Sequence, residues 1–347
     1  MNRTGLIGHG RVIDLLEEEA RSAAHAYMFV GPDGVGKAMI ALRFAAVILC
    51  DRSGQHDGPC SVCDRVASGN HPDVTLVVPD GRASIGVEQA RTAVHAASMT
   101  PVEGEKKVIL IDEASILTES AANALLKTLE EPSPSTVFIL VAESEDDLPS
   151  TIASRCRTVH FGRVRLDELI SGLELLGLDP EQAQRVAVIS GGRPGLARQL
   201  ATEKEVVEFR QFWLTVPERV TPQTGNSFLL ADAAERAAAP LIKTIETADP
   251  NETKTQKERR ERSAKRAAQA LMITGLEILA SWYTDAAAAQ FGVAVRNPDV
   301  DVTRLAMITP AEATQNAEAA LDAVTAIRQN QRVPLVLANL FNELARE

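Results

Sequence analysis

The chain has 347 residues, of which 45% are hydrophobic and 24% charged, and these proportions are typical of a soluble globular protein with two or three domains. Its net charge of −11 argues against a protein whose main task is to grip nucleic-acid backbones, because that task needs a clustered basic surface. No apolar run reaches the roughly 18 residues that span a bilayer, and no signal peptide is recognisable at the N-terminus. We therefore expect a cytoplasmic protein without a membrane partner.

Five apolar runs in the first half of the chain are predicted to be β-strands. The runs are largely apolar rather than alternating, which is typical of strands that are buried on both faces of a parallel sheet. Helical stretches lie between the runs, so residues 1–163 are expected to form a three-layer α/β domain with a five-stranded parallel sheet. The predicted strands are Ala26–Val30, Val74–Val78, Val108–Ile111, Val137–Ala142 and Thr158–Phe161.

The pattern changes after Phe161. Residues 164–205 are predicted to form short helices, which are broken at the sequence SGGRPG of residues 190–195. Residues 206–347 show only helical periodicity. We therefore expect two helical domains after the α/β domain, a small one and a larger one.

The stretch 249–266 contains no Val, Ile, Leu, Met or aromatic residue. One interpretation is a DNA contact. The other, which we favour, is a solvated helix extension or a loose insertion, supported by i,i+4 pairs such as Glu258 with Arg262. Its basic residues are Lys254, Lys257, Arg259, Arg260, Arg262, Lys265 and Arg266.

The sequence GPDGVGK of residues 31–37 follows the first predicted strand and precedes a helical stretch, which is the context that a phosphate-binding loop requires. Its glycines, Gly31, Gly34 and Gly36, let backbone N–H groups turn toward an anion. The start of the helix adds a partial positive charge, and Lys37 adds a full one. The pattern predicts a site for ATP or ADP.

Asp112 and Glu113 follow the third predicted strand. In such folds the aspartate holds Mg²⁺ and the glutamate aligns the attacking water. The loop departs from its pattern at Ala38, where the hydroxyl of a serine or threonine would ligate Mg²⁺. Lys37 and the backbone can still hold phosphates, but we expect Mg²⁺-dependent hydrolysis to be impaired.

Three further stretches make a family resemblance specific: HAYMFVGP at 25–32, LLKTLEEP at 125–132 and LPSTIASRC at 148–156. Together with the loop and the acidic strand, they resemble the clamp-loader branch of the AAA+ proteins, and within it the delta prime subunits of bacterial DNA polymerase III. The resemblance covers about residues 7–200, and the last third matches only in being helical and of the right length. It implies an AAA+ domain (1–163), a helical lid domain (164–205) and a helical collar domain (206–347).

The function implied by the resemblance is that of a stator in a hetero-pentameric ring with gamma/tau-like and delta-like subunits. The ring loads the sliding clamp onto primed DNA during replication. The family's Ser-Arg-Cys motif maps onto Ser154, Arg155 and Cys156, so Arg155 is the candidate arginine finger for a neighbouring subunit's ATP. Such fingers are worth roughly 10³–10⁵ in rate, because the guanidinium offsets charge that develops in the transition state.

The chain's own ATP site departs from active relatives in three places. Besides Ala38, the strand before the arginine motif ends in Ala142-Glu143, where active relatives carry a threonine or asparagine that senses the γ-phosphate. A carboxylate there would repel phosphate. Pro194 replaces the lid arginine, with Arg193 one residue away. We expect a subunit that does not turn over ATP; the alternative is a self-sufficient AAA+ ATPase motor like gamma/tau.

Cysteine spacing predicts a metal site. Cys60 and Cys63 form a C-x₂-C pair with Cys50 upstream, and in a cytoplasmic chain such spacing favours metal over a disulfide. The family carries a four-cysteine zinc module inserted near residues 50–70, in which these cysteines match the first, third and last ligands.

The register of that module, set by the segment GNHPD at 69–73, places the second ligand position on Asp57, with His56 beside it. Either side chain can bind zinc. The alternative is a decayed module with three free thiols.

Overall fold

The computed structural model describes residues 5–51, 60–79, 84–200, 205–246, 254–293, 295–297 and 300–345. The chain divides into two compact units, Met1–Ala201 and Thr202–Glu347, and each is described by itself. The predicted lid segment, 164–205, falls largely within the first unit. The division of the chain into three domains stays a prediction.

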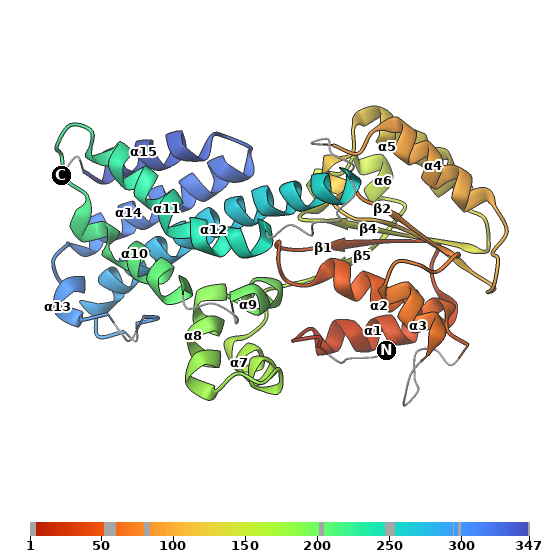
Figure 1. Cartoon of the computed structure of the whole chain (residues 1–347), viewed down its shortest axis with the longest axis horizontal. Coiled ribbons are helices and arrows are strands. Elements are labelled where there is room, and N and C mark those ends of the chain that lie inside the picture. Colours follow the sequence, from red (N-terminus) through yellow and green to blue (C-terminus); the bar gives the residue numbers. More distant parts are fainter. Residues whose placement is uncertain are drawn as a thin grey trace. The chain divides into compact units, whose positions relative to one another are not determined.

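A five-stranded parallel sheet forms the centre of the first unit (Figure 1). Its strand order is β2-β3-β4-β1-β5. The five predicted strands are confirmed. The strands are β1 (Ala26–Val30), β2 (Val74–Val77), β3 (Lys107–Ile111), β4 (Thr136–Ala142) and β5 (Arg157–His160).

Helices cover both faces of the sheet, so the unit has three layers (Figure 1). One face is covered by α1 (Gly10–Glu19), α2 (Lys37–Leu49) and α3 (Ser61–Ala67). The other face is covered by α4 (Val87–Ser98), α5 (Glu119–Glu130) and α6 (Ser150–Ala153). Short 3₁₀ turns occupy Ala20–Ser22, Ala114–Ile116 and Glu145–Asp147.

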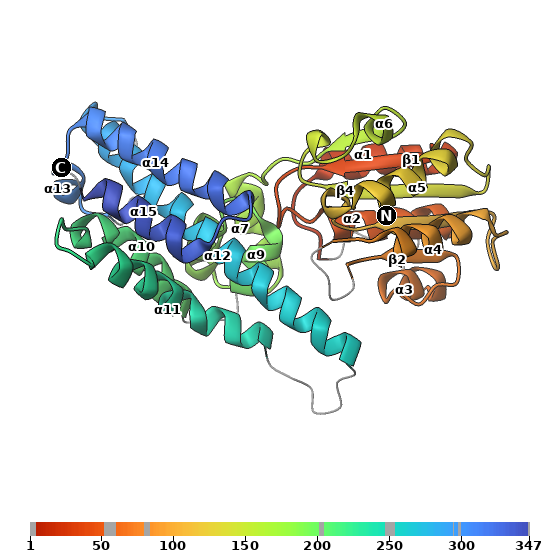
Figure 2. The ribbon, with the colours of Figure 1, turned by 90° about the horizontal axis from the view of Figure 1, so that it is seen from above.

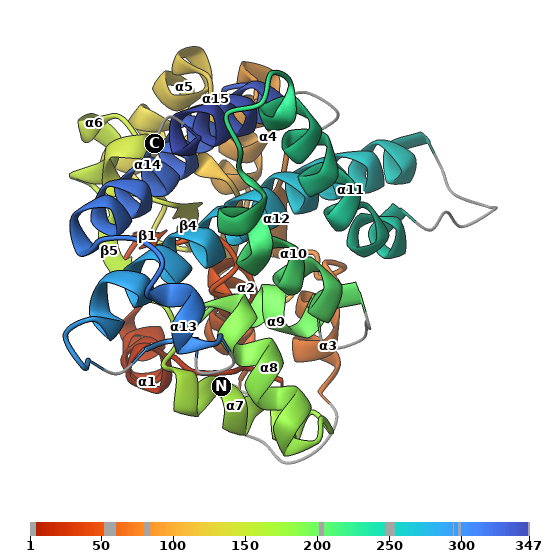
Figure 3. The same ribbon diagram turned by 90° about the vertical axis from the view of Figure 1, so that its left-hand side faces the viewer.

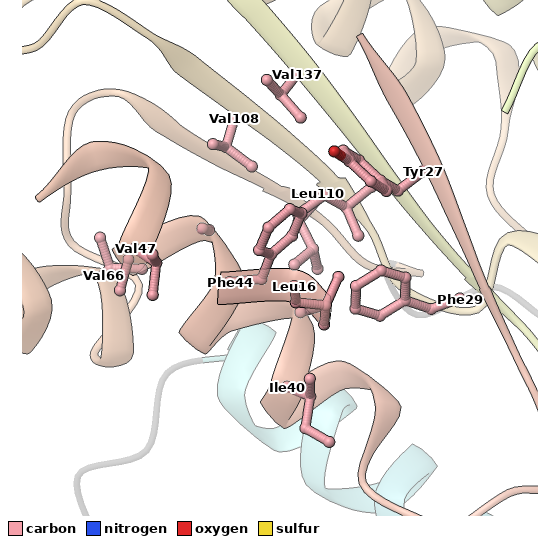
Figure 4. Close-up of a cluster of buried hydrophobic side chains, with 14 of the residues drawn as sticks. Leu16, Tyr27, Phe29, Ile40, Phe44, Val47, Val66, Val108, Leu110 and Val137 are labelled. Atoms are coloured by element: carbon pink, nitrogen blue, oxygen red, sulfur yellow. The ribbon is translucent and has the colours of Figure 1, made fainter. Parts of the chain in front are cut away.

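Two apolar clusters lie on the two faces of the sheet. Successive side chains of a strand point to opposite faces. Tyr27 and Phe29 of β1 therefore pack toward Phe44 of α2, with the ring centroids of Tyr27 and Phe44 4.9 Å apart (Figure 4). Met28 belongs to the other cluster, with Phe138 of β4. Burial on both faces explains why the central strands are apolar throughout.

Three short helices complete the first unit: α7 (Leu166–Leu175), α8 (Pro180–Ser190) and α9 (Pro194–Leu200). Figure 3 shows α7 and α8 side by side. The Asp179 side chain accepts from the backbone N–H of Gln182 and caps α8, and Gly191, at φ 56°, ends it. Glycine in the left-handed region is a common helix stop, so the predicted break at 190–195 is confirmed.

The second unit is helical. Its long helices pack side by side (Figure 2), and α12 contacts both α11 and α14. At Gly275 of α12, a Cβ would lie 1.9 Å from the ring of Trp213 in α10, so this contact requires glycine. The helices are α10 (Glu205–Arg219), α11 (Asn226–Glu246), α12 (Lys254–Ala289), α13 (Val302–Leu305), α14 (Pro310–Arg328) and α15 (Val333–Leu344).

The basic stretch 249–266 lies partly within α12. Residues 254–266 form the beginning of this helix, whereas 249–253 lie outside the described residues. Lys257 is exposed and 3.9 Å from the Glu261 carboxylate. For residues 254–266 the helix-extension interpretation therefore holds over the loose insertion. Within the described parts of the chain, no helix combines the length and the apolar character that crossing a bilayer demands.

Candidate functional site

The phosphate-loop sequence connects β1 to α2. Gly31, Gly34 and Gly36 have φ angles of 152°, 75° and 102°, which L side chains rarely adopt. At Gly31 a side chain is also excluded by contact, because a Cβ would lie 2.1 Å from the carbonyl oxygen of Phe161. The glycines are therefore required by the path of the loop into Lys37, the first residue of α2.

The ammonium group of Lys37 is directed back onto the loop. Its Nζ donates to the carbonyl oxygens of Gly31 at 2.6 Å and Pro32 at 2.7 Å, and the residue is only 7% exposed. Burial lowers the pKa of Lys37, and nearby carboxylates oppose this shift. A phosphate would have to replace the carbonyl contacts in a carboxylate-rich surrounding. The opposing carboxylates are Asp33, Glu143, Asp112 and Asp147.

The acidic residues lie at the same edge of the sheet as Lys37. Asp112 and Glu113 follow β3, and Asp112 Oδ1 accepts from the Glu113 backbone N–H at 3.0 Å. Glu113 has φ 55°, which is uncommon for a residue with a side chain. Glu143 follows β4, and its carbonyl oxygen accepts from the N–H of Gly31 at 3.1 Å. The structure therefore brings these sequence-predicted positions together around the loop.

The segment before α9 is hydrogen-bonded to the loop. The backbone N–H of Gly195 donates to the carbonyl oxygen of Gly34 at 2.9 Å. Arg193 is 6% exposed, and its Cβ would be 3.4 Å from a Cβ at Gly34. The Nε of Arg193 donates to the Ser190 carbonyl oxygen at 3.0 Å. Pro194 begins α9, so the position at which the family resemblance leads us to expect an arginine offers no cation here.

This arrangement can offer a phosphate the backbone N–H groups of the loop, the start of α2 and the Lys37 ammonium group. Asp112 supplies a carboxylate for a metal ion. Ala38, the second residue of α2, supplies no hydroxyl. The loop thus retains groups that bind phosphate and lacks one that binds Mg²⁺.

Arg155 lies between α6 and β5. Its Nη2 donates to Glu130 Oε1 at 2.6 Å, and its Nη1 donates to the Thr151 carbonyl oxygen at 2.7 Å and to Ser154 Oγ at 3.4 Å. Its side chain is 33% exposed. The guanidinium is therefore held by its own chain and is still accessible at the surface.

Arg155 and the phosphate loop lie at opposite ends of the sheet. The loop follows the last residue of β1, whereas Arg155 precedes the first residue of β5. The two strands are parallel, with Tyr27 opposite Arg157, so Arg155 is level with His25. Six residues separate that level from Gly31, which corresponds to about 20 Å along the strand. Arg155 cannot reach a phosphate in its own loop.

Three cysteine thiols converge between α2 and α3. Cys50 follows α2, Cys60 precedes α3 and Cys63 lies in its first turn. The Sγ atoms of Cys50 and Cys60 are 3.9 Å apart, and all three ligand atoms lie within 4.8 Å of one another. In a tetrahedral site with Zn–S bonds of about 2.3 Å, two sulfurs are about 3.8 Å apart. The three thiols are therefore compatible with a zinc ion.

The candidates for a fourth ligand, His56 and Asp57, lie outside the described residues. Burial raises the pKa of the Cys63 thiol to about 12, so a metal ion would have to displace its proton. The remaining cysteine, Cys156, packs against the apolar cluster of α4 and α5, and burial raises the pKa of its thiol to about 12.

Asp73 is a buried carboxylate whose role was not apparent from the sequence. It is 0% exposed and accepts from three backbone N–H groups, those of Val102 at 2.6 Å, Glu103 at 2.9 Å and Gly104 at 3.1 Å. Burial alone would raise the pKa of Asp73, but these donors outweigh it and hold the pKa below its usual value. Asp73 thus fixes the loop that leads into β3.

Arg65 of α3 ties the cysteine-bearing segment to the same loop. It forms two hydrogen bonds with the Glu103 carboxylate, at 2.7 Å and 2.6 Å. His71 is buried, its Nδ1 accepts from the Asp73 N–H at 3.1 Å, and its Nε2 lies 3.9 Å from Glu103. The sequence identified the segment 69–73 by its resemblance to the family, but it did not indicate that Asp73 and His71 contact residues 102–104.

Comparison with known proteins places the first half of the chain in one family. A family model described as DNA polymerase III, delta subunit, matches residues 8–165. The DNA polymerase III subunit delta prime of Bacillus subtilis is 34% identical over 221 residues, which are 63% of this chain and 67% of that protein. That of Pseudomonas aeruginosa is 37% identical over 185 residues, 51% of this chain and 56% of that protein. The chain thus aligns with roughly one half to two thirds of these relatives.

Two other matches are more limited. The DNA polymerase III subunit tau of Bacillus subtilis is 34% identical over 163 residues, 46% of this chain and 28% of that protein. A solved gamma subunit-related protein of Thermotoga maritima is 16% identical and covers 96% of this chain and 98% of its own, with a TM-score of 0.44, a likeness too distant to bear on function. The delta prime matches extend over more of both partners than the tau match, and the chain belongs to the family of DNA polymerase III delta prime subunits.

Proposed function

We propose that the chain is a stator of a clamp loader, which supplies Arg155 to ATP held by a neighbouring gamma/tau-like subunit. The observation that carries the proposal is the placement of Arg155 before β5, at the end of the sheet opposite to its own phosphate loop. From there it can approach a phosphate only on another chain. A guanidinium at the γ-phosphate offsets charge that develops during transfer.

The chain's own loop supports a passive role. Lys37 donates to the carbonyls of Gly31 and Pro32, Ala38 has no hydroxyl, and Glu143 adds negative charge nearby. These features favour a stator over the alternative, a self-sufficient motor subunit. Binding of ATP or ADP without turnover is compatible with the loop.

Zinc has a structural role in this proposal. Cys50, Cys60 and Cys63 would hold the ion, with Asp57 or His56 as the fourth ligand. Bound zinc would join the end of α2 to the start of α3, and such sites add directly to folding free energy. Arg65 and Glu103 extend that connection to the loop before β3.

The proposed partners follow from the family. They are gamma/tau-like and delta-like subunits of a hetero-pentamer, contacted through the helical second unit, and the sliding clamp and primed DNA through the assembled ring. A subunit of the replication machinery would work in the cytoplasm. The net charge of −11 agrees with a protein that meets DNA as one member of a complex.

The test is ATP turnover by the ring reconstituted from this chain and its candidate partner subunits. Arg155→Ala should abolish most turnover at the one site that it serves, a loss of roughly 10³–10⁵ there, and lower total turnover and clamp loading accordingly. Arg185→Ala removes an exposed arginine that pairs with Glu181 at 2.6 Å in α8, and it should leave turnover unchanged.

Unchanged turnover in the Arg155→Ala ring would remove the finger assignment. The isolated wild-type chain should turn over ATP far more slowly than the ring. A rate in isolation close to that of motor subunits would favour the alternative function instead.

A further inference from the structure

Glu130, the last residue of α5, contacts Arg155 across 25 positions of sequence. The Nη2–Oε1 distance is 2.6 Å, and the two side chains are 33% and 48% exposed. A guanidinium has five N–H donors. One N–H of Nη2 donates to the Glu130 carboxylate. Nη1 donates to the Thr151 carbonyl oxygen and to the Ser154 hydroxyl oxygen. Among the described residues the other donors have no acceptor, so they are left for an acceptor outside the chain.

The bases of both residues are fixed by the core. Leu129, beside Glu130, is 2% exposed, and Ile152, in the turn before Arg155, is 0% exposed. Both belong to the same apolar cluster. The carboxylate and the guanidinium therefore rise from backbone that packing holds in place, which is the arrangement that keeps a functional side chain in one geometry.

We propose that Glu130 is a positioning residue for Arg155: it holds the guanidinium in the orientation that meets the neighbouring subunit's γ-phosphate. This inference rests on the proposed function of Arg155. A free arginine side chain has many rotamers, and ordering them at an interface opposes binding. A guanidinium that is already oriented avoids that cost and stays aligned as charge develops in the transition state.

In the contrary role, Glu130 would hold the guanidinium away from the phosphate and so lower activity. The two roles predict opposite signs when the carboxylate is removed. The Thr151 bond favours positioning, because this carbonyl oxygen of α6 and the Glu130 carboxylate hold the two ends of the guanidinium together, which fixes its orientation.

The experiment measures steady-state ATPase of the reconstituted ring with Glu130→Ala, Glu130→Gln, Arg155→Ala and the double variant. Glu130→Ala should lower turnover at the one site that Arg155 serves by roughly three- to tenfold, in the range of coupling between residues in contact, with KM for ATP unchanged. Total turnover of the ring should therefore fall, but by less than in Arg155→Ala. Glu130→Gln keeps an acceptor for Nη2 and should recover part of the loss. The double variant should match Arg155→Ala, because without the guanidinium there is nothing to position.

Glu131→Ala is the matched control. It removes the same charge one residue away, and within the described residues no hydrogen bond or ion pair of the Glu131 side chain is seen. It should leave kcat unchanged. Thermal unfolding of each isolated variant, followed by circular dichroism, verifies that the chains are folded.

The outcomes separate the two claims. If Arg155→Ala lowers kcat and Glu130→Ala raises it or leaves it unchanged, positioning is wrong while the finger assignment holds. An equal further loss from Glu130→Ala in the Arg155→Ala background, or an equal loss in Glu131→Ala, would likewise overturn positioning. If Arg155→Ala has no effect, the finger assignment itself fails.

Discussion

Replacement of Asp73 by asparagine should destabilise the first unit strongly, although the two side chains have almost the same shape. Asp73 is fully buried, and its two oxygens accept three backbone N–H groups of the loop before β3. Asparagine has one acceptor oxygen. In its best orientation that oxygen keeps the bonds from Glu103 and Gly104, and the N–H of Val102 then faces an NH₂ group.

The magnitude follows from those contacts. One hydrogen bond to a charged acceptor is lost, at about 1.5–3 kcal/mol, and two others change from a charged to a neutral acceptor, at about 1 kcal/mol each. We therefore expect the free energy of unfolding to fall by about 3.5–5 kcal/mol at pH 7. The exposed Asp64 of α3 provides the control, because Asp64→Asn should change it by less than about 0.5 kcal/mol.

The effect should depend on pH with a definite sign. The pKa of Asp73 is lower in the folded chain than its ordinary value of 3.8. The ionised form therefore stabilises the fold above that value, and the contribution is lost as the pH falls through the folded pKa. The difference between wild type and Asp73→Asn should be complete at pH 7 and should shrink below about pH 4.

Urea unfolding followed by far-ultraviolet circular dichroism at several pH values provides the measurement. A difference under about 1 kcal/mol at pH 7 would show that the three N–H groups find other acceptors. A large difference that stays constant down to pH 3 would show that the charge of Asp73 contributes nothing. Either result refutes the reasoning.

Two further predictions concern the metal site and the loop. The purified chain should contain one zinc ion, which Cys63→Ser releases and Cys156→Ser retains; metal analysis that finds far less than one ion in the wild type would favour the decayed module. Gly31→Ala should cost at least about 2 kcal/mol of unfolding free energy, because its Cβ would meet the Phe161 carbonyl in a disfavoured backbone conformation. Gly162→Ala, where a Cβ meets nothing within 4 Å, should be nearly neutral in the same denaturation assay.

The fold was largely predictable because its strands are continuous in sequence and its central strands, β1, β3 and β4, are buried on both faces. The edge strands β2 and β5 are partly exposed. Each predicted strand is found within one residue of its expected ends, and the strand, glycine loop and helix around Lys37 occur in the expected order. Local patterns suffice for such elements, because their causes, burial and backbone conformation, act on neighbouring residues.

The contacts between distant segments were not predictable. The Glu130–Arg155 pair, the Gly195 bond to the loop and the donors to Asp73 all join residues that are far apart in sequence. A single sequence shows that each residue is polar or small, but it does not show which backbone groups will lie beside it. Such partners require the three-dimensional path of the chain.

Arg155 and the phosphate loop lie at opposite ends of the sheet, so the two would face different neighbouring chains. Two copies related by a two-fold axis use the same surface on both sides and form a closed pair. A contact in which the arginine of one chain meets the loop of the next is heterologous, and repeated contacts of this kind form a row. Under the proposed function, the chain supplies Arg155 to one neighbour, and its own loop needs no arginine from another. Such a chain would stand at the end of a row of subunits, and the row would not close beyond it.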